Sequence, residues 1–318
     1  MAETYFSFFG GFVILILGAH WLVNGASSIG EKLGVSQLVM GLTVVALGTS
    51  LPELIVNIFA GAQNKTDLAI GNILGSNITN TLLVVGAAAM VFPVSVGKKS
   101  FQFDIPYSLF VLLILALLVN DSLFGRPNRV NRIDGFILLF FLGFFLYTSF
   151  FKSEKEDESL LPEIKVYPLF LSVVYIVLGG AGLYFGGDRI VGSAVLIAKD
   201  MGISEAAMGL TLVAGATSLP ELVTSVIAAR KQNSNMAFGN AIGSNILNIT
   251  LVLGITALIK PIPFQSHLNI EIGLVFFAGL MMMFFIKSGK NKFTLNRAEG
   301  FFLILLYVAF IYFSTQYQ

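Results

Sequence analysis

Apolar and polar residues are arranged along this chain in long blocks, and ten of the apolar blocks are long enough to form membrane-spanning helices. A bilayer core of about 30 Å needs about 20 mostly apolar residues in an α-helix. On this rule we expect spans at residues 6–28, 37–62, 68–91, 105–120, 133–151, 166–190, 205–229, 235–259, 268–286 and 298–315. No basic residue precedes the first run, unlike in a cleaved signal peptide, so we expect it to remain as the first span.

Composition agrees with a protein that lies mostly inside a bilayer. Hydrophobic residues make up 56% of the 318 positions and charged residues 12%, with a mean hydropathy of +0.84. Soluble domains are about 45–50% apolar and about 25% charged. The absence of cysteine excludes disulfides, thiolate metal sites and cysteine nucleophiles. Only His20 and His267 offer imidazole, which argues against a transition-metal site built from several histidines.

A block of forty residues occurs twice. Residues 41–80 align without a gap with residues 209–248, and about half of the paired positions are identical. Polar residues repeated inside apolar segments indicate a functional site. The shared residues include Thr49, Ser50, Pro52, Glu53, Asn72, Gly75, Ser76 and Asn80 in the first copy, and Thr217, Ser218, Pro220, Glu221, Asn240, Gly243, Ser244 and Asn248 in the second.

The repetition extends beyond this block, because shorter matches flank it on both sides. We therefore expect two repeats of five spans each, residues 1–151 and 166–318, joined by a short acidic cytoplasmic linker at 152–165. Five is odd, so the second repeat enters the membrane from the opposite side. The predicted fold class is an all-α integral membrane protein with ten transmembrane helices in two inverted-topology repeats.

Glycine and proline interrupt four of the predicted spans, at residues 48–52, 71–75, 215–220 and 239–243. Broken backbone at membrane depth is tolerated where protein or a water-filled cavity satisfies the freed polar groups. We therefore expect broken core helices that meet near the bilayer midplane. Loops on one side hold about twice as many Lys and Arg residues as loops on the other, so the positive-inside rule places both termini outside.

Two glutamates inside the repeated block determine its expected chemistry. An acidic side chain at the centre of a span costs about 3 kcal/mol on insertion scales. The motif segments hold no Lys or Arg as a partner, so a bound cation is the natural counter-ion. The nearby groups offer only oxygen, which hard cations such as Ca²⁺ prefer. The predicted ligands are Glu53, Glu221, Thr49, Thr217, Ser50, Ser218, Ser76, Ser244, Asn80 and Asn248, with carbonyls freed at the breaks near Ala46 and Ala214.

The Ser, Thr and Asn side chains have a second interpretation, in which they only join helices or cap broken ends. Their repetition in register with the two glutamates favours the cation site. For Asn72 and Asn240, capping of the break and direct ligation remain equally open.

The motifs resemble those of a known family. GTSLPE at 48–53, ATSLPE at 216–221 and GNxxGSNxxN at 71–80 and 239–248 resemble the two alpha repeats of the cation/calcium exchanger superfamily, and within it the prokaryotic sodium/calcium exchangers. The resemblance covers all ten predicted spans. It implies alternating access, in which Na⁺ entry drives Ca²⁺ out, usually with three Na⁺ per Ca²⁺.

The resemblance also implies how the ions are bound. Ca²⁺ would bind Glu53 and Glu221 with the backbone carbonyls of Thr49 and Thr217. The first and sixth spans would be the gating pair. Flanking Na⁺ sites would use Ala46, Ser50 and Ser76 on one side, and Ala214, Ser218 and Ser244 on the other.

Two residues depart from the family pattern. Position 248 is Asn where some archaeal relatives and the potassium-dependent branch carry Asp, which leaves two carboxylates and argues against potassium dependence. Ala216 replaces the usual Gly, so the local carbonyl ligands of the second repeat remain open. The GSN element also lacks the glutamate usual in the proton-coupled branch.

The predicted function is Na⁺/Ca²⁺ antiport. The alternative is a proton-coupled or broad-specificity divalent cation antiporter, because oxygen ligands alone do not reject Mn²⁺, Sr²⁺ or Cd²⁺. A channel is less compatible with two halves that enclose a site within one chain. The sequence contains no HExxH motif and no GxSxG motif with a suitable histidine, so we expect no enzyme. We also expect no cofactor besides the transported ions, no nucleic-acid partner, a plasma (inner) membrane location and a functional monomer.

Overall fold

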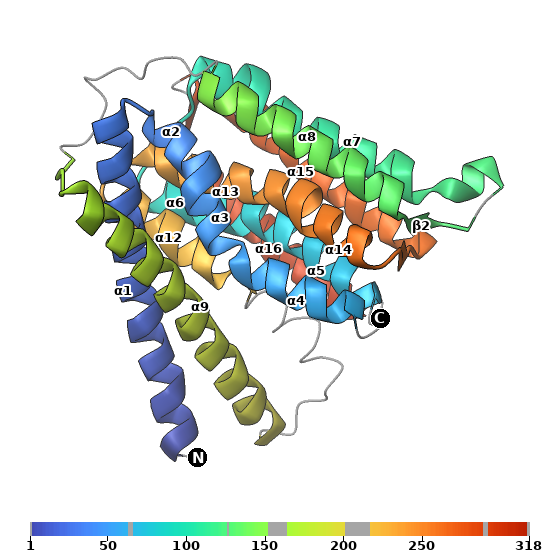
Figure 1. Ribbon diagram of the computed structural model, residues 1–318, viewed down its shortest axis with the longest axis horizontal. Coiled ribbons are helices and arrows are strands. Elements are labelled where there is room, and N and C mark those ends of the chain that lie inside the picture. Colours follow the sequence, from blue (N-terminus) through green and yellow to red (C-terminus); the bar gives the residue numbers. More distant parts are fainter. Residues whose placement is uncertain are drawn as a thin grey trace.

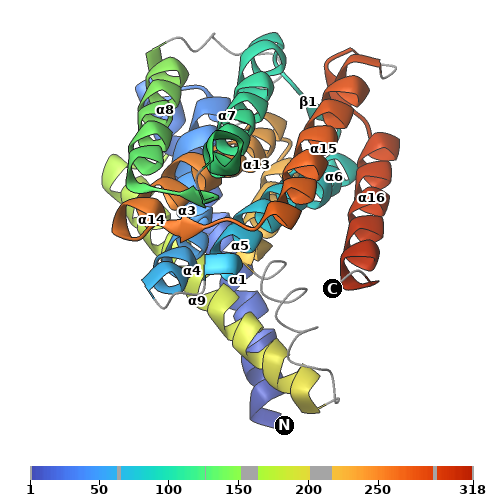
Figure 2. The ribbon, with the colours of Figure 1, turned by 90° about the vertical axis from the view of Figure 1, so that its right-hand side faces the viewer.

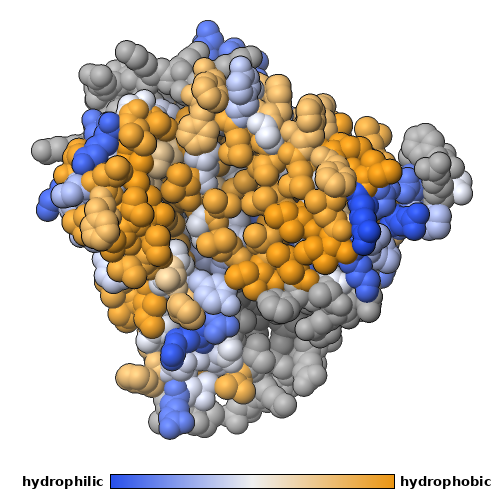
Figure 3. Space-filling view, viewed as in Figure 1, coloured by the Kyte–Doolittle hydropathy of each residue, from blue (hydrophilic) through white to orange (hydrophobic). Residues whose placement is uncertain are grey.

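A computed structural model describes residues 2–62, 66–125, 127–151, 164–200, 217–288 and 292–316. Helices dominate this part of the chain, and its four strands have two residues each. Seven of the described helices are long and apolar enough to cross a membrane, or eight when a bent pair at 37–58 counts as one span. Apolar side chains cover much of the face in Figure 3. The chain is therefore an all-helical, multi-pass membrane protein, and the count of ten spans stays a prediction.

The helices and strands follow one another in a similar order in the two halves. The first half contains α1 (Ala2–Leu33), α2 (Gln37–Met40), η1 (Gly41–Val45), α3 (Ala46–Thr49), α4 (Leu51–Ala62), α5 (Thr66–Ile78), η2 (Thr79–Val84), α6 (Val85–Val91), β1 (Val94–Ser95), η3 (Ser100–Asp104), α7 (Ile105–Val119), η4 (Asp121–Phe124), β2 (Arg129–Val130) and α8 (Arg132–Phe151). The described second half contains α9 (Leu169–Asp200), α12 (Leu219–Arg230), α13 (Ser234–Leu247), η7 (Asn248–Leu253), α14 (Gly254–Ile259), β3 (Ile262–Pro263), η8 (Ser266–Leu268), α15 (Asn269–Ser288), β4 (Thr294–Leu295) and α16 (Arg297–Gln316).

Helices α1 and α9 form a long antiparallel pair that projects from the other helices (Figures 1 and 2). Gly11 of α1 lies against Gly186 of α9, and Gly18 lies against Gly179. A Cβ added to Gly18 would approach the Gly179 carbonyl oxygen to 2.8 Å. Small residues let membrane helices bring their backbones together. Glycine therefore makes this close helix contact possible.

The two helical segments that carry the GSN motifs lie at the centre of the molecule. In each of residues 69–91 and 234–259, 78% of the most apolar window is buried, against 44% or less in the other candidate spans. Helices α7, α8, α15 and α16 lie around this centre (Figure 2). The motif residues on the central helices are therefore shielded from lipid.

The predicted break at 48–52 is confirmed. Ser50 adopts φ −83° and ψ 6° between α3 and α4, and the segments on either side are bent by 43°. Pro52 follows, and proline has no N–H with which to continue the helical hydrogen-bond ladder. In the second half, Ser218 adopts nearly the same angles, φ −85° and ψ 3°, before α12. Residues 215 and 216 of the second predicted break lie outside the described residues.

The predicted breaks at 71–75 and 239–243 are wrong, because α5 and α13 run through them as continuous helices. The glycines of α13 instead allow α2 and η1 to pack closely against this helix. A Cβ on Gly239 would lie 2.6 Å from the Leu38 carbonyl oxygen, and one on Gly243 would lie 2.4 Å from the Leu42 carbonyl oxygen. The helical geometry changes further along, where both central segments widen into π-helix at η2 and η7.

Equivalent features occur at equivalent places in the two halves. Strand β1 pairs with β4, and β2 pairs with β3, both antiparallel. A Cβ on Gly86 would lie 2.8 Å from the Gly300 carbonyl oxygen, and one on Gly135 would lie 2.8 Å from the Gly254 carbonyl oxygen. Each contact joins one half to the other. Among the described residues, the two halves are therefore in contact at several places far apart in the chain.

Candidate cation site

The two motif glutamates begin the helices that follow the breaks. Glu53 lies in the first turn of α4 and Glu221 in the first turn of α12. Both side chains are fully buried, with 0% exposure. The unpaired N–H groups and the dipole of a helix stabilise negative charge in its first turn. The fold thus places two carboxylates in the interior of a membrane protein, each at the N-terminus of a helix that stabilises its negative charge.

The Glu221 carboxylate contacts residues from both halves of the chain. Its Oε1 accepts a hydrogen bond of 3.0 Å from Ser50 Oγ and one of 3.4 Å from Ser244 Oγ. Its Oε2 has no hydrogen-bond partner among the described residues. One oxygen is therefore oriented by hydroxyls, while the other is available to a ligand.

The Glu53 carboxylate is less satisfied. Neither of its oxygens has a hydrogen-bond partner in the described part of the chain. Two like charges buried in the same region would also repel each other. Burying an ionised carboxylate without a partner costs several kcal/mol. We therefore expect the charge of Glu53 and Glu221 to be neutralised by a bound cation, or by protons when no cation is bound.

The two motif threonines donate across the halves in the same manner. Thr49 Oγ1 donates to Asn240 Oδ1 at 3.1 Å, and Thr217 Oγ1 donates to Asn72 Oδ1 at 3.1 Å. Asn240 Nδ2 in turn donates to the backbone carbonyl of Glu221 at 3.3 Å. In this structure the role observed for both asparagines is to position the motif segments.

The motif serines lie beside these threonines. Ser76 Oγ is 3.5 Å from Thr217 Oγ1, and Ser244 Oγ is 3.5 Å from Thr49 Oγ1. Ser218 Oγ is buried and has no hydrogen-bond partner among the described residues. All these hydroxyls therefore lie in the same buried region as the carboxylates.

The amides of Asn80 and Asn248 lie one turn beyond the serines, and both residues are fully buried. No described residue satisfies either polar atom of the Asn80 amide. Asn248 Nδ2 donates to Asn77 Oδ1 at 3.3 Å, while its Oδ1 has no partner in the described ranges. Both side chains thus keep an amide oxygen that a cation can use.

The backbone ligands predicted at the breaks are only partly accounted for. The Ala46 carbonyl accepts hydrogen bonds from Ser50 N at 2.9 Å and from Thr49 Oγ1 at 3.2 Å. This carbonyl is therefore hydrogen-bonded in the present conformation, and because a carbonyl oxygen has two lone pairs its role as an ion ligand stays a prediction. Ala214 lies outside the described residues.

The donor set of this region consists of carboxylate, hydroxyl, amide and carbonyl oxygens. In the described part of the chain, no three His, Cys, Asp or Glu residues group as a metal cluster would require. Such an oxygen-only set with two carboxylates suits a hard cation such as Na⁺ or Ca²⁺ better than a transition metal.

Two further asparagines join the central helices. Asn77 Nδ2 donates to the Asn245 carbonyl at 3.4 Å, and Asn245 Nδ2 donates to Thr81 Oγ1 at 2.9 Å. Neither was among the predicted site residues. Their signal was present, since both belong to the repeated GSN triplet. They hold the two central helices against each other beside the site.

Comparison with known proteins then identifies the family. The sequence pattern of the family described as "Sodium/calcium exchanger protein" matches residues 4–151 and 171–316. The chain belongs to this exchanger family. Its members are membrane transporters, so this exchanger is a cation antiporter and not an enzyme.

Several relatives match the exchanger over nearly its whole length. It is 37% identical to the putative antiporter CaxA of Alkalimonas amylolytica over 309 residues, which is 95% of each protein. It is 33% identical to the sodium/calcium exchanger MaX1 of Methanosarcina acetivorans, over 95% of each protein. The solved structure of the sodium-calcium exchanger NCX_Mj soaked with 2.5 mM Na⁺ and 10 mM Sr²⁺ is similar to it with a TM-score of 0.83 and 30% identity, over 97% of both chains.

Proposed function

We propose that this exchanger couples Na⁺ movement in one direction to Ca²⁺ movement in the other, with three Na⁺ exchanged for one Ca²⁺. The observation that carries the proposal is the pair of buried carboxylates, Glu53 and Glu221, which together have three oxygens without a protein partner among the described residues. Two carboxylates match the charge of one divalent ion. The same oxygens serve Na⁺ when Ca²⁺ leaves, so the two ions compete for one site.

The ligand roles follow the repeat. Ca²⁺ is bound by Glu53 and Glu221 with the backbone carbonyls of Thr49 and Thr217. Na⁺ is bound at flanking positions, with Asn80 and Asn248 supplying amide oxygens nearby. The Na⁺ ligands are Ala46, Ser50 and Ser76 on one side, and Ala214, Ser218 and Ser244 on the other.

Alternating access follows from the arrangement of two halves around one site. We assign ten spans in two inverted five-helix repeats, with both termini outside the cell membrane and the exchanger acting as a monomer. Helices α1 and α9 move against the core as the gating pair. The glycine contacts between α1 and α9 support movement of the two helices as one unit, because they bring the two backbones close together.

Exchange of three Na⁺ for one Ca²⁺ moves one net charge. The membrane potential then contributes about 2.3 kcal/mol per 100 mV. Ca²⁺ uptake then carries one net positive charge out of a vesicle, so it is faster when the interior of the vesicle is made positive. An electroneutral exchanger shows no such dependence.

The alternative is proton-coupled or broad-specificity divalent cation antiport. The two Glu53 oxygens without a partner among the described residues are compatible with proton coupling, because such a carboxylate also accepts a proton. The test is ⁴⁵Ca²⁺ uptake into proteoliposomes preloaded with Na⁺ and diluted into choline. Uptake that requires internal Na⁺ and whose rate does not change with an imposed pH gradient supports Na⁺ coupling. Uptake that follows the pH gradient without Na⁺ overturns it.

A further inference from the structure

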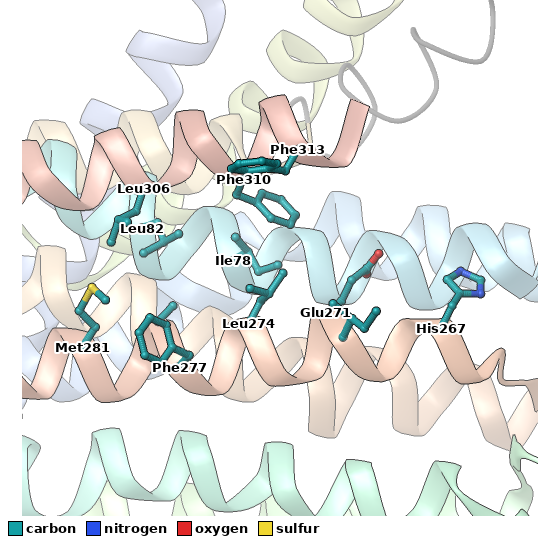
Figure 4. A pocket seen from close by; sticks show the side chains of 12 residues that line it. Ile78, Leu82, His267, Glu271, Leu274, Phe277, Met281, Leu306, Phe310 and Phe313 are labelled. Carbon is teal, nitrogen blue, oxygen red and sulfur yellow. The ribbon is translucent and has the colours of Figure 1, made fainter. Parts of the chain in front are cut away.

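The two histidines of the chain lie in opposite electrostatic surroundings. His267 lies one turn from the carboxylate of Glu271, at one end of an apolar groove of about 660 Å³ that α15, α16 and the segment α5–η2 form together (Figure 4). His20 of α1 instead lies close enough to Lys231 and Arg230 for their positive charges to act on it. The surroundings of His20 therefore favour an anion, whereas those of His267 include a negative charge.

One helix from each half brings the basic residues together. Helix α1 of the first half contacts α12 of the second half. Asn24 lies one turn after His20 in α1, and its side-chain oxygen accepts a hydrogen bond from Lys231 Nζ at the end of α12. Arg230, the last residue of α12, is exposed. We call His20, Arg230 and Lys231 the basic site.

No carboxylate in the described part of the chain neutralises the basic site. None of its three residues forms an ion pair with a described residue, and Lys231, which is half-buried, has only the neutral amide of Asn24 as a partner there. Glu31 of α1 lies seven residues beyond Asn24, which is about 10 Å along the helix. A basic side chain within a membrane span is costly unless it is paired. The basic site therefore favours an anionic ligand.

The surface of α1 changes from apolar to polar along one stripe that leads to the basic site. Val13 is 58% exposed and Leu17 is 46% exposed, and both precede His20 at helical spacing. In a membrane protein such exposed apolar side chains are in contact with hydrocarbon. Trp21 is also exposed, and tryptophan is enriched where a span meets the membrane surface. Arg230 ends its helix on the same side, so the positive charge lies beyond the apolar stretch.

We propose that the basic site binds a phospholipid with net negative charge, of the phosphatidylglycerol class. One acyl chain lies along Val13 and Leu17, and the phosphate beyond it accepts hydrogen bonds from His20, Lys231 and Arg230. The order of these residues, apolar first and basic afterwards, is the order of acyl chain and phosphate in the lipid. Basic pockets between membrane helices bind anionic headgroups. A zwitterionic headgroup adds a cation that the basic residues repel, so the site selects lipids by net charge.

The bound headgroup contacts two helices with different proposed roles. Helix α1 belongs to the proposed gating pair, and α12 carries Glu221 of the cation site. A headgroup that bridges both helices stabilises the conformation in which they lie side by side. This consequence for transport rests on the proposed function, whereas lipid binding itself does not. With both termini outside, the basic site lies in the cytoplasmic leaflet, which carries the anionic lipids.

The test is a fluorescence measurement of lipid binding on the full chain. Trp21 is the sole tryptophan and lies one turn after Leu17, so the unsubstituted protein carries its own reporter beside the basic site. The exchanger is reconstituted in phosphatidylcholine vesicles that contain an increasing fraction of brominated phosphatidylglycerol or brominated phosphatidylcholine. We expect brominated phosphatidylglycerol to quench Trp21 with about tenfold higher apparent affinity.

The matched variants are Arg230→Gln, Lys231→Gln and Lys32→Gln, which each remove one positive charge. Arg230 is exposed, so its substitution leaves the packing of the helices unchanged. Lys32 is an exposed basic residue in the last turn of α1, two turns beyond Asn24. Arg230→Gln and Lys231→Gln should each decrease the preference to about threefold or less. Lys32→Gln should retain the tenfold preference.

A competition experiment distinguishes a lipid headgroup from free phosphate. Inorganic phosphate is added to the vesicles with brominated phosphatidylglycerol, and chloride at equal ionic strength is the control. We expect both salts to decrease the quenching of Trp21 equally, because a free anion has no acyl chain to occupy the apolar stripe. A larger decrease with phosphate would assign the basic site to a free anion and overturn the lipid proposal.

Four further outcomes would overturn the proposal. Equal quenching by the two brominated lipids would show contact with acyl chains without recognition of the headgroup. A preference that persists in both Arg230→Gln and Lys231→Gln would place the recognition elsewhere. An equal loss in Lys32→Gln would show a general effect of surface charge. Absence of quenching by either lipid would show that protein covers Trp21. None of these results depends on the transport assay, so a failure of this proposal leaves the proposed function untouched.

Discussion

Ser50 of the first half donates a hydrogen bond of 3.0 Å to the carboxylate of Glu221 in the second half. The equivalent contact, from Ser218 to Glu53, is absent among the described residues, since neither Ser218 Oγ nor either Glu53 oxygen has a partner. Two residues that are equivalent in sequence therefore have different environments. The alternating access proposed above requires such asymmetry, because two equivalent halves around one site then take different conformations at any one time.

The first prediction concerns these two serines. Ser50→Ala removes a donor from a buried carboxylate, and a lost hydrogen bond to a charged group costs about 1.5–3 kcal/mol. Ser218→Ala removes a hydroxyl that has no partner among the described residues. Thermal unfolding in detergent without Na⁺ or Ca²⁺ should show a larger decrease in Tm for Ser50→Ala. Equal decreases would contradict the observed asymmetry.

The second prediction concerns the carboxylates. Glu53→Gln and Glu221→Gln each remove one of the two negative charges, so Ca²⁺ affinity should decrease by about a hundredfold or more, equivalent to roughly 3 kcal/mol. The measurement is Na⁺-dependent ⁴⁵Ca²⁺ uptake, together with the increase in Tm caused by Ca²⁺. Glu31→Gln, at an exposed position near the end of α1, is the control and should behave as the unsubstituted protein. Robust uptake by Glu53→Gln would reject the proposed site.

The third prediction concerns the threonine hydroxyls. Thr49→Val keeps the side-chain shape but leaves Asn240 Oδ1 without the donor it has now. We expect the apparent Ca²⁺ affinity to decrease about fivefold, as for the loss of one hydrogen bond of about 1 kcal/mol. Thr256→Val is the matched control, because the Thr256 hydroxyl donates to the carbonyl of Val252, which lies one turn earlier in the same helical segment. An equal effect of both substitutions would mean that the link from Thr49 to Asn240 has no special role.

The fourth prediction compares two glycines that are equivalent in the repeats. A Cβ on Gly239 would lie 2.6 Å from the Leu38 carbonyl oxygen, whereas a Cβ on Gly71 would meet nothing within 4 Å. Gly239→Ala should therefore destabilise the protein by about 1–3 kcal/mol, as other overpacked substitutions do. Gly71→Ala should have little effect or stabilise α5 slightly, because alanine favours helix. Thermal unfolding of both variants checks this, and a destabilised Gly71→Ala would disagree with the described packing.

Short-range sequence patterns determined the membrane helices of this protein, one of its helix breaks and its two central glutamates. Apolar runs of about 20 residues require membrane helices, because no other open structure satisfies the backbone inside a bilayer. Pro52 predicted the bend that Ser50 now forms, since proline cannot donate the next helical hydrogen bond. Glu53 and Glu221 were recognisable from the sequence, because a carboxylate repeated inside an apolar span needs a partner.

The tertiary structure decided which glycines lie in close helix contacts and which partners the polar residues bind. Gly71 and Gly239 gave the same signal in sequence, and both predicted breaks were wrong. Only packing against α2 and η1 shows why Gly239 must be small. The partners of the polar residues were likewise undetermined, since a hydroxyl or an amide bonds whatever the fold brings within about 3 Å. The contact of Ser50 with Glu221 and the groove beside Glu271 both join segments far apart in the chain. Such contacts depend on how the helices pack, and that packing is a property of the whole chain.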